Sequence, residues 1–299
     1  MNPFTWSAMG VISALGAILA LMVPCPLRSG LLAGLLGSYL VLLAVGALVP
    51  RLNFYLHAAC RGPSAQPWVA LTFDDGPDPA ITPLLLELLR REGVPATFFY
   101  IGEAAQRYPA LVTEAAADGH LIANHSNHHG YAWAFASERQ LLAEFEAANR
   151  VLSSILGHSP RFVRTPVGIS RPGLDKVLHH LRLRNIAWDV RGLEGFHRDP
   201  ERISAHIADR ARNGSIILLH ELYYGVARFD PQQVLRTTQL TIDRLRARGF
   251  SLVHLDQLLG QAEAQSWVGN WDSPSGIEAL MAEEGRGEVA SATSRASRA

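Results

Sequence analysis

Five short apolar runs, each ending in polar or charged residues, constrain the fold of this chain most strongly. They open the segments 69–75, 121–130, 161–168, 185–194 and 215–221. Helical patterns lie near or between them at 82–92, 104–117, 138–156, 200–212 and 231–248. Strands that alternate with helices are typical of a parallel sheet, and polar residues at the carboxyl ends of successive strands are typical of α/β barrels. About seven strands can be recognised, which predicts an α/β fold with a distorted (β/α) barrel.

Two adjacent carboxylates, Asp74 and Asp75, end the first apolar run and precede Gly76-Pro77. Neighbouring side chains of a strand point to opposite sides, so the two carboxylates can have different roles. Carboxylates this close repel each other unless a cation or a proton separates them. The alternative is an ordinary Asp-Gly-Pro turn without a chemical function.

A histidine pair follows about fifty residues later, at His125 and His129. Spacing of four residues on a turn of helix places both imidazoles on one face, where they can reach the same ion. Two histidines and one carboxylate form a three-ligand site with an open position, as in catalytic zinc sites. Iron, cobalt and nickel accept the same ligands, so Zn²⁺, Co²⁺, Ni²⁺ and Fe²⁺ all remain candidates. His128 falls on the other face, and we do not expect it to be a ligand.

Four motifs in a fixed order carry a resemblance to a known family. They are Thr72-Phe73-Asp74-Asp75-Gly76-Pro77, His125-Ser126-x-x-His129, Arg164-x-Pro166-x-Gly168 and Leu218-x-His220. In these the chain resembles the polysaccharide deacetylases (carbohydrate esterase family 4, the NodB-homology domain), over roughly residues 66–260. The resemblance implies a distorted (β/α) barrel and a divalent metal. It also implies the removal of acetyl groups from N-acetylated sugars, including those of chitin and peptidoglycan.

The resemblance also implies roles for the residues around the metal. Asp75, His125 and His129 would bind it. Asp74 would be the general base that takes a proton from the attacking water. Arg164 would pair with Asp74 and orient it, and its positive charge would favour the carboxylate form.

Three further residues would act on the substrate if the resemblance holds. The backbone N–H of Val167 would stabilise the oxyanion, although the family usually has an aromatic residue there. His220 would be the general acid that protonates the leaving amine. Leu218 would line the pocket for the acetyl methyl group.

The fourth motif departs from the family pattern Asp-x-x-Asp-Trp. Arg191 replaces the aspartate that normally orients the catalytic histidine, and Gly195 replaces the tryptophan that forms a wall of the groove. Glu194, Asp189 or Glu221 could orient His220 instead, and the sequence does not distinguish among them. These changes affect the expected substrate recognition more than the expected metal site.

The first fifty residues predict a membrane anchor. Residues 4–23 and 31–49 contain no charged side chain, and each run is about long enough to cross a bilayer as a helix. A polar break at 24–29 between them predicts a two-helix transmembrane hairpin in residues 1–52. A cleaved signal peptide is the alternative, but no basic segment precedes the first run. We expect a linker at 53–66, a catalytic domain at 67–260 and a disordered tail at 261–299.

The orientation of the anchor is weakly marked. Arg28 lies in the expected loop, whereas Arg51 and Arg61 follow the second helix, so the positive-inside rule favours a cytoplasmic catalytic domain. The usual substrates of the resembled family lie outside the cytoplasm. We therefore expect an extracytoplasmic domain on a multi-pass membrane protein.

The charge balance excludes one class of partner. Lys plus Arg and Asp plus Glu each number 27, so the formal net charge is zero. The sequence has no basic patch of the kind that binds nucleic acid, so we do not expect a nucleic-acid partner. Oligomeric state is not indicated. The sequence thus predicts a membrane-anchored, metal-dependent N-deacetylase with a carbohydrate substrate. An esterase for O-acetyl sugars and a non-catalytic carbohydrate-binding protein are the alternatives.

Overall fold

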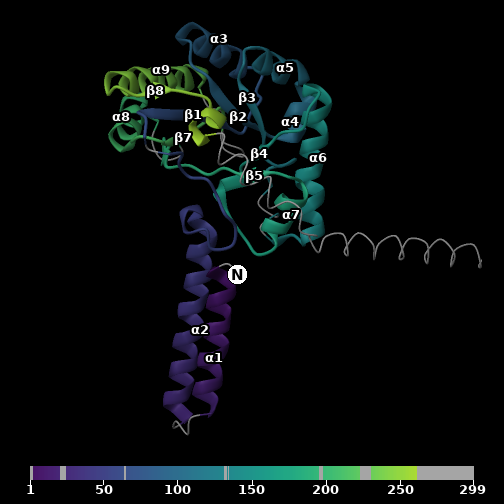
Figure 1. Cartoon of the computed structure of the whole chain (residues 1–299), viewed down its shortest axis with the longest axis vertical. Coiled ribbons are helices and arrows are strands. Elements are labelled where there is room, and N and C mark those ends of the chain that lie inside the picture. Colours follow the sequence, from purple (N-terminus) through teal and green to yellow (C-terminus); the bar gives the residue numbers. More distant parts are fainter. Residues whose placement is uncertain are drawn as a thin grey trace, which may run out of the picture.

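The computed structural model describes the backbone of residues 3–20, 25–63, 65–130, 133, 135–194, 198–222 and 230–260, and their side chains except at 16–20 and 25–28. Within these residues a curled sheet is surrounded by helices, and a pair of helices projects from it (Figure 1). The expected tail at 261–299 and Gly195 lie outside the described residues.

The sheet consists of β1 Trp68–Asp74, β2 Ala96–Tyr100, β3 Leu121–Asn124, β4 Phe162–Val163, β5 Arg184–Asn185, β6 Val190–Arg191, β7 Ile216–His220 and β8 Ser251–Leu252. The described helices are α1 Pro3–Ala20, α2 Cys25–Leu48, α3 Thr82–Glu92, α4 Gly102–Arg107, α5 Pro109–Ala117, α6 Glu138–Leu156, α7 Leu174–His180, α8 Pro200–Arg210, α9 Pro231–Ala247 and α10 Leu255–Leu259. Short 3-10 turns occur at Pro50–Leu52 and Pro166–Gly168.

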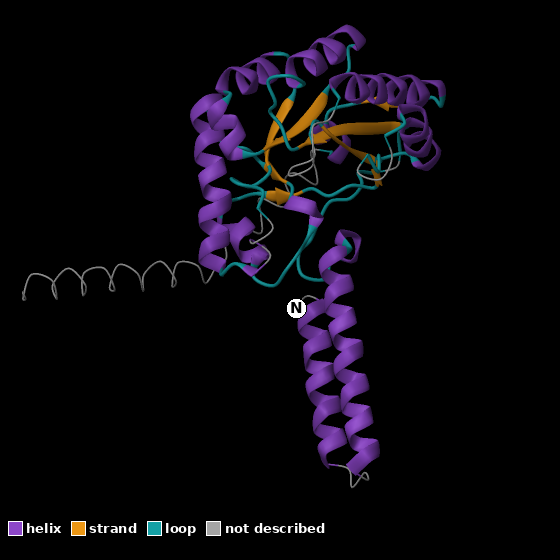
Figure 2. Ribbon diagram, turned by 180° about the vertical axis from the view of Figure 1, so that it is seen from behind, coloured by secondary structure: helices purple, strands orange, loops and turns teal. Residues whose placement is uncertain are grey.

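All paired strands are parallel, in the order β5-β4-β3-β2-β1-β7-β6, and β8 pairs with the start of β1. The strands at the two ends of this order, β5 and β6, are separated by only four residues, 186–189. The sheet must therefore curl until its two edges meet. This confirms the distorted barrel, and Figure 2 shows the curvature from behind.

The segment expected to be a linker contributes to the closure of this barrel. Ala59 forms a parallel bridge with Ile186, and Arg61 forms an antiparallel bridge with Ser215. Ala58 and Ala59 are buried. Residues 58–61 therefore lie between β5 and the start of β7, where the regular strands leave a gap.

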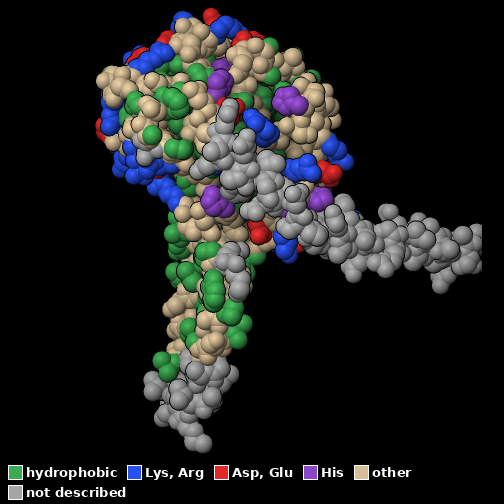
Figure 3. Space-filling view, viewed as in Figure 1, with side chains coloured by type: hydrophobic (Ala, Val, Ile, Leu, Met, Phe, Trp, Pro, Cys, Tyr) green, Lys and Arg blue, Asp and Glu red, His purple; other side chains and the backbone are tan. Residues whose placement is uncertain are grey.

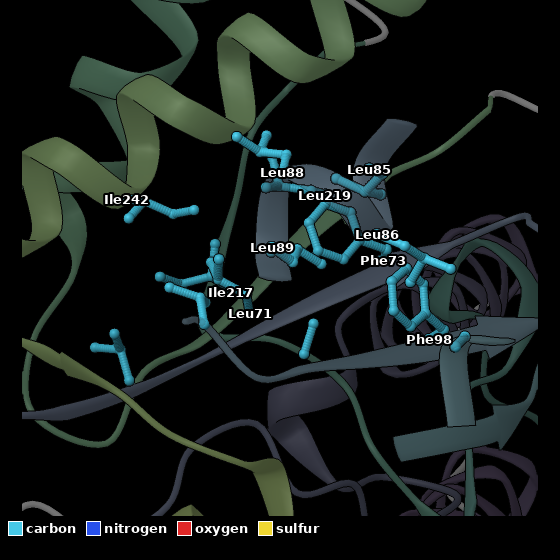
Figure 4. Close-up of a cluster of buried hydrophobic side chains, with 14 of the residues drawn as sticks. Leu71, Phe73, Leu85, Leu86, Leu88, Leu89, Phe98, Ile217, Leu219 and Ile242 are labelled. Atoms are coloured by element: carbon cyan, nitrogen blue, oxygen red, sulfur yellow. The ribbon is translucent and has the colours of Figure 1, made fainter. Parts of the chain in front are cut away.

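The main core lies between the sheet and α3 and α9. Its side chains include Leu71, Phe73, Leu85, Leu86, Leu89, Phe98, Ile217, Leu219 and Ile242, all of them buried (Figure 4). Near-continuous apolar strands are typical of a parallel sheet covered by helices. The core thereby fixes β1 and β7, whose carboxyl ends carry the expected site residues.

Several helix boundaries follow from local sequence signals. Ser137 caps α6 in a capping box with Gln140, and Gly93 ends α3 in a left-handed conformation. The single helix expected at 104–117 is wrong, because Tyr108 is not helical and Pro109 starts a new helix, α5. The apolar run that opens the segment 185–194, expected as one strand, is instead the two short strands β5 and β6.

The two N-terminal helices lie side by side and project away from the barrel (Figures 1 and 2). Residues Ser29–Leu48 of α2 are long and apolar enough to cross a membrane, whereas the described apolar part of α1, Pro3–Leu15, is shorter. Helix α2 starts at Cys25, inside the break expected at 24–29, and its first turn tolerates Pro26. Hydrophobic side chains are exposed along this pair, while charged ones gather on the barrel (Figure 3).

We predict that Leu89→Ala lowers the free energy of unfolding by about 2–5 kcal/mol, because Leu89 is fully buried and its truncation leaves a cavity. Leu84, on the same helix, is 38% exposed, so Leu84→Ala should cost less than about 1 kcal/mol. Denaturant unfolding of the full chain in detergent, followed by tryptophan fluorescence, measures both. Equal losses for the two variants would contradict the described packing of α3.

Candidate active site

The expected site residues meet at the carboxyl end of the barrel. Asp74 is the last residue of β1 and His220 the last of β7, and the two are partners in the register of these parallel strands. His125 directly follows β3, and Arg164 directly follows β4. The barrel thus brings together residues from four strands that are far apart in the sequence.

Three of these residues form a cluster of potential metal ligands. One donor atom from each of Asp75, His125 and His129 lies within 4.8 Å of the other two. Asp75 Oδ1 is 3.3 Å from His125 Nε2 and 3.3 Å from His129 Nε2. All three side chains are buried. A carboxylate oxygen and two imidazole nitrogens converging in this way fit a divalent metal.

The histidines converge through a loop, so the helical turn expected at 125–129 is wrong. Ser126 and His129 have positive φ angles of 67° and 52°, which a helix cannot contain. Asn124 Oδ1 accepts a hydrogen bond from Ser126 N–H at 2.7 Å, and Ser126 Oγ accepts one from His129 N–H at 3.1 Å. His128 is exposed and pairs with Glu144 at 2.9 Å, away from the cluster as expected.

Burial, hydrogen bonds and neighbouring charges set the protonation of the cluster. Burial opposes protonation of His125, but the charges of Asp74 and Asp75 outweigh it and raise the pKa, so binding of a metal at Nε2 would release a proton. His125 Nδ1 lies 2.8 Å from the carbonyl oxygen of Arg164, so this nitrogen donates and Nε2 is left as the electron-pair donor. Burial, together with the charge of His125, lowers the pKa of His129 to about 4, which keeps it neutral at pH 7. Burial opposes ionisation of Asp75, but the hydrogen bond and charge of His125 outweigh it and lower its pKa to about 2.

Asp74 is held by a buried arginine. Arg164 Nη1 donates to Asp74 Oδ1 at 2.6 Å and to Thr72 Oγ1 at 2.8 Å. The guanidinium also donates to the carbonyl oxygens of Ile186 and Ala187, at 3.1 Å each. A guanidinium fixed by four hydrogen bonds keeps Asp74 in one orientation, at the side of the cluster where His125 Nε2 is 3.7 Å from Asp74 Oδ2.

Glu194 is the acidic residue that the structure places beside His220. Its Oε1 lies 3.7 Å from His220 Nδ1, and both side chains are largely buried. Burial disfavours the charged imidazole, but the adjacent carboxylate of Glu194, with smaller contributions from Asp75 and Asp74, raises the pKa of His220 to about 9. His220 is therefore protonated at neutral pH, as a general acid must be.

The other two acidic candidates have different partners. Asp189 forms ion pairs with Arg51, Arg61 and Arg212. Glu221 is fully buried and accepts a hydrogen bond from Thr82. The sequence left these alternatives open because only the curvature of the barrel determines which carboxylate faces the histidine.

Val167 lies in the turn after β4, and Leu218 lies in β7. Val167 is 55% exposed at the rim and has a positive φ of 59°. Gly168 follows it with a φ of 70°, and a Cβ there would lie 2.4 Å from the Trp188 ring, so this position requires glycine. Leu218 is buried two residues before His220 and so faces the same side of β7.

Asp75, Ser126, His129, Val167 and Leu193 are non-glycine residues with positive φ angles, and all lie in loops at or beside this site. Such conformations are uncommon, and they concentrate at functional sites because the surrounding structure must hold them. No sequence pattern identified them in advance.

Comparisons with known proteins agree with the geometry. The family described as polysaccharide deacetylase matches residues 61–186. A chitooligosaccharide deacetylase of Azorhizobium caulinodans is 34% identical over 204 residues, which cover 66% of this chain and 97% of the relative. A peptidoglycan-N-acetylglucosamine deacetylase of Bacillus cereus is 30% identical over 205 residues, which cover 66% of this chain and 90% of the relative.

A solved structure gives the same result for the fold. The crystal structure of the Bc1960 peptidoglycan N-acetylglucosamine deacetylase superposes with a TM-score of 0.62 and 28% identity, covering 67% of this chain and 92% of that one. The relatives with this barrel are named as deacetylases of carbohydrates. The chain belongs to the polysaccharide deacetylase family.

We predict that Asp75→Ala abolishes binding of Zn²⁺ to the purified full chain, because only two imidazoles would remain to hold it. His128→Ala serves as the matched control, since His128 is outside the cluster, and it should bind one equivalent as the unaltered chain does. Titration calorimetry, with metal content after dialysis, measures both. Unchanged binding by Asp75→Ala would contradict this ligand set.

Proposed function

We propose that this protein is a metal-dependent hydrolase that removes N-acetyl groups from an amino-sugar glycan or sugar-lipid. The observation that carries the proposal is the position of Asp74. It ends β1 between a cluster fit for a metal and the buried guanidinium of Arg164, with His220 beside it on β7. Amide hydrolysis needs a base, an electrophilic centre and an acid, and this arrangement supplies a candidate for each.

Asp74 is the proposed general base. Its hydrogen bond to Arg164 fixes the orientation of the carboxylate, whose other oxygen can accept a proton. When bound by Asp75, His125 and His129, a divalent metal would polarise the acetyl carbonyl and make water more acidic. Asp74 lies at the edge of that cluster, where it would take the proton that the attacking water loses.

His220 is the proposed general acid, and Val167 the proposed oxyanion donor. Protonated His220, held by Glu194, would give its proton to the nitrogen of the sugar as the amide bond breaks. The N–H of Val167 belongs to the turn Pro166–Gly168, in which Val167 alone is exposed at the rim and open to a substrate carbonyl. A preorganised donor of this kind stabilises the transition state by about 3 kcal/mol. Leu218 would contact the acetyl methyl group.

We further propose that α1 and α2 anchor the enzyme as a two-helix hairpin with the catalytic domain outside the cytoplasm. The length of Ser29–Leu48 and the pairing of α1 with α2 support the anchor. A reporter fused at the carboxyl end of the chain, active on only one side of the membrane, distinguishes the two orientations.

We predict acetate release from N-acetylated chito-oligosaccharides by the full chain with Zn²⁺. Asp74→Asn should lower kcat at least about a hundredfold, because the amide cannot accept the proton. Asp74→Asn should still bind Zn²⁺, and His128→Ala should keep its activity. Acetate release from acetyl-xylan alone would favour the esterase alternative, and release from neither substrate by the metal-loaded chain would contradict the proposal.

A second prediction concerns pH. Because the protonated form of His220 donates the proton and its pKa is raised to about 9, activity should fall as the pH rises through about 9. Glu194→Gln removes the charge that stabilises the imidazolium, so the alkaline limb of the kcat profile should move to lower pH. Glu194→Asp should restore it in part, and Glu103→Gln, exposed on α4, should not move it. If the alkaline limb of the kcat profile lies at the same pH in Glu194→Gln as in the unaltered chain, the pairing of Glu194 with His220 is contradicted.

A further inference from the structure

The rim of the candidate site is hydrogen-bonded to the end of the apolar helix α2. Ser170 N–H donates to the carbonyl oxygen of Ala47 at 2.9 Å, and Ser170 Oγ donates to that of Gly46 at 3.2 Å. Ser170 is buried, and it follows the turn that carries Val167. The contact therefore joins the last turn of the membrane-spanning candidate to the loop proposed to hold the oxyanion.

The length of α2 places this contact at the surface of a bilayer. Ser29–Leu48 has 20 residues, which as a helix extend about 30 Å, the thickness of the hydrocarbon layer. Ala47 then lies at the hydrocarbon boundary, and the headgroup layer beyond it is roughly 5–8 Å thick. Three residues span at most about 11 Å, so Val167 lies within or just above the headgroups.

The loop that contains Trp133 and Ala136 is hydrogen-bonded to the segment next to Ser170. Arg171, the neighbour of Ser170, donates from Nη1 to the carbonyl oxygens of Ala136 and, at 3.3 Å, of Trp133. These residues follow the ligand His129. Phe135 lies among them and is 93% exposed. Exposed aromatic rings are typical of side chains that enter the lipid interface, and this one lies in a loop that is hydrogen-bonded to Arg171, the neighbour of Ser170.

The catalytic domain is fixed to α2 by further contacts. Tyr55 Oη donates to the carbonyl oxygen of Leu43 at 3.2 Å, and Arg51 forms an ion pair with Asp189 at 2.7 Å. Leu56 packs in a buried cluster with Trp133. These contacts oppose rotation of the barrel relative to α2, so the site stays at a fixed distance from the bilayer.

We infer that the substrate is an N-acetylated sugar attached to a membrane lipid and presented at headgroup level. This rests on the proposed deacetylase function and names its substrate class. A sugar on a lipid is held at the height of Val167, whereas a soluble oligosaccharide has to reach the same site from the bulk. The exposed apolar rim would contact the lipid that carries the sugar.

The test uses the full chain in liposomes with Zn²⁺ and two probes that share one reacting group. One is N-acetylglucosamine on polyprenyl diphosphate in the same liposomes, and the other is soluble di-N-acetylchitobiose. We expect kcat/KM at least tenfold higher for the lipid-linked probe, and a rate that falls when extra phospholipid dilutes it in the bilayer. An equal or higher value for the soluble sugar would overturn the inference and leave the deacetylase function intact. Acetate release from neither probe would overturn both.

A variant pair tests the rim itself. Phe135→Ser should lower the rate on the lipid-linked probe several-fold and leave the rate on the soluble sugar unchanged. Leu84→Ser, on α3 at the end of the barrel away from α1 and α2 (Figure 1), should change neither. An equal loss on both probes, or no loss on either, would show that Phe135 does not contact the lipid and would contradict the placement of the rim.

Discussion

The buried ion pair between Arg164 and Asp74 is the interaction on which the rest of the site depends. The side chain of Arg164 joins β1 to the segment after β5, through Asp74 and the carbonyl oxygens of Ile186 and Ala187. Its own carbonyl oxygen accepts the hydrogen bond of His125 Nδ1. One residue therefore orients both the proposed base and a proposed metal ligand. Removing one partner of such a pair leaves an uncompensated buried charge, which costs about 3–5 kcal/mol.

The altered fourth motif changes how His220 is held without removing an acidic partner. Arg191, which stands where the family has aspartate, is exposed at the end of β6. The chain then turns at Leu193, which has a φ of 62°, and the turn brings Glu194 to His220. A Cβ on Gly192 would lie 2.6 Å from the Glu194 carboxyl group, so the glycine makes room for it. The longer side chain of glutamate reaches the histidine from a later position in the loop.

The sequence correctly predicted the parts of the site that depend on the order of the strands. It did not predict the parts whose geometry depends on the backbone conformation of the loops. Asp74, Asp75 and His220 lie at strand ends, so their meeting follows from a parallel barrel. The helical turn proposed for His125 and His129 was wrong because spacing alone does not reveal a left-handed Ser126. The choice of Glu194, and the contact of Ser170 with α2, depend on segments that pair only in the folded chain, and no local pattern records them.

The bridges made by Ala59 and Arg61 have a consequence for any soluble form of this enzyme. These residues close the seam between β5 and β7, although they precede the first strand and lie only about ten residues beyond α2. If α1 and α2 anchor the chain as proposed, proteolytic release would have to cut before residue 58, ahead of both bridging residues, to give an intact barrel. A cut even a few residues later would leave the seam open, so anchorage and catalysis cannot be separated at the start of β1.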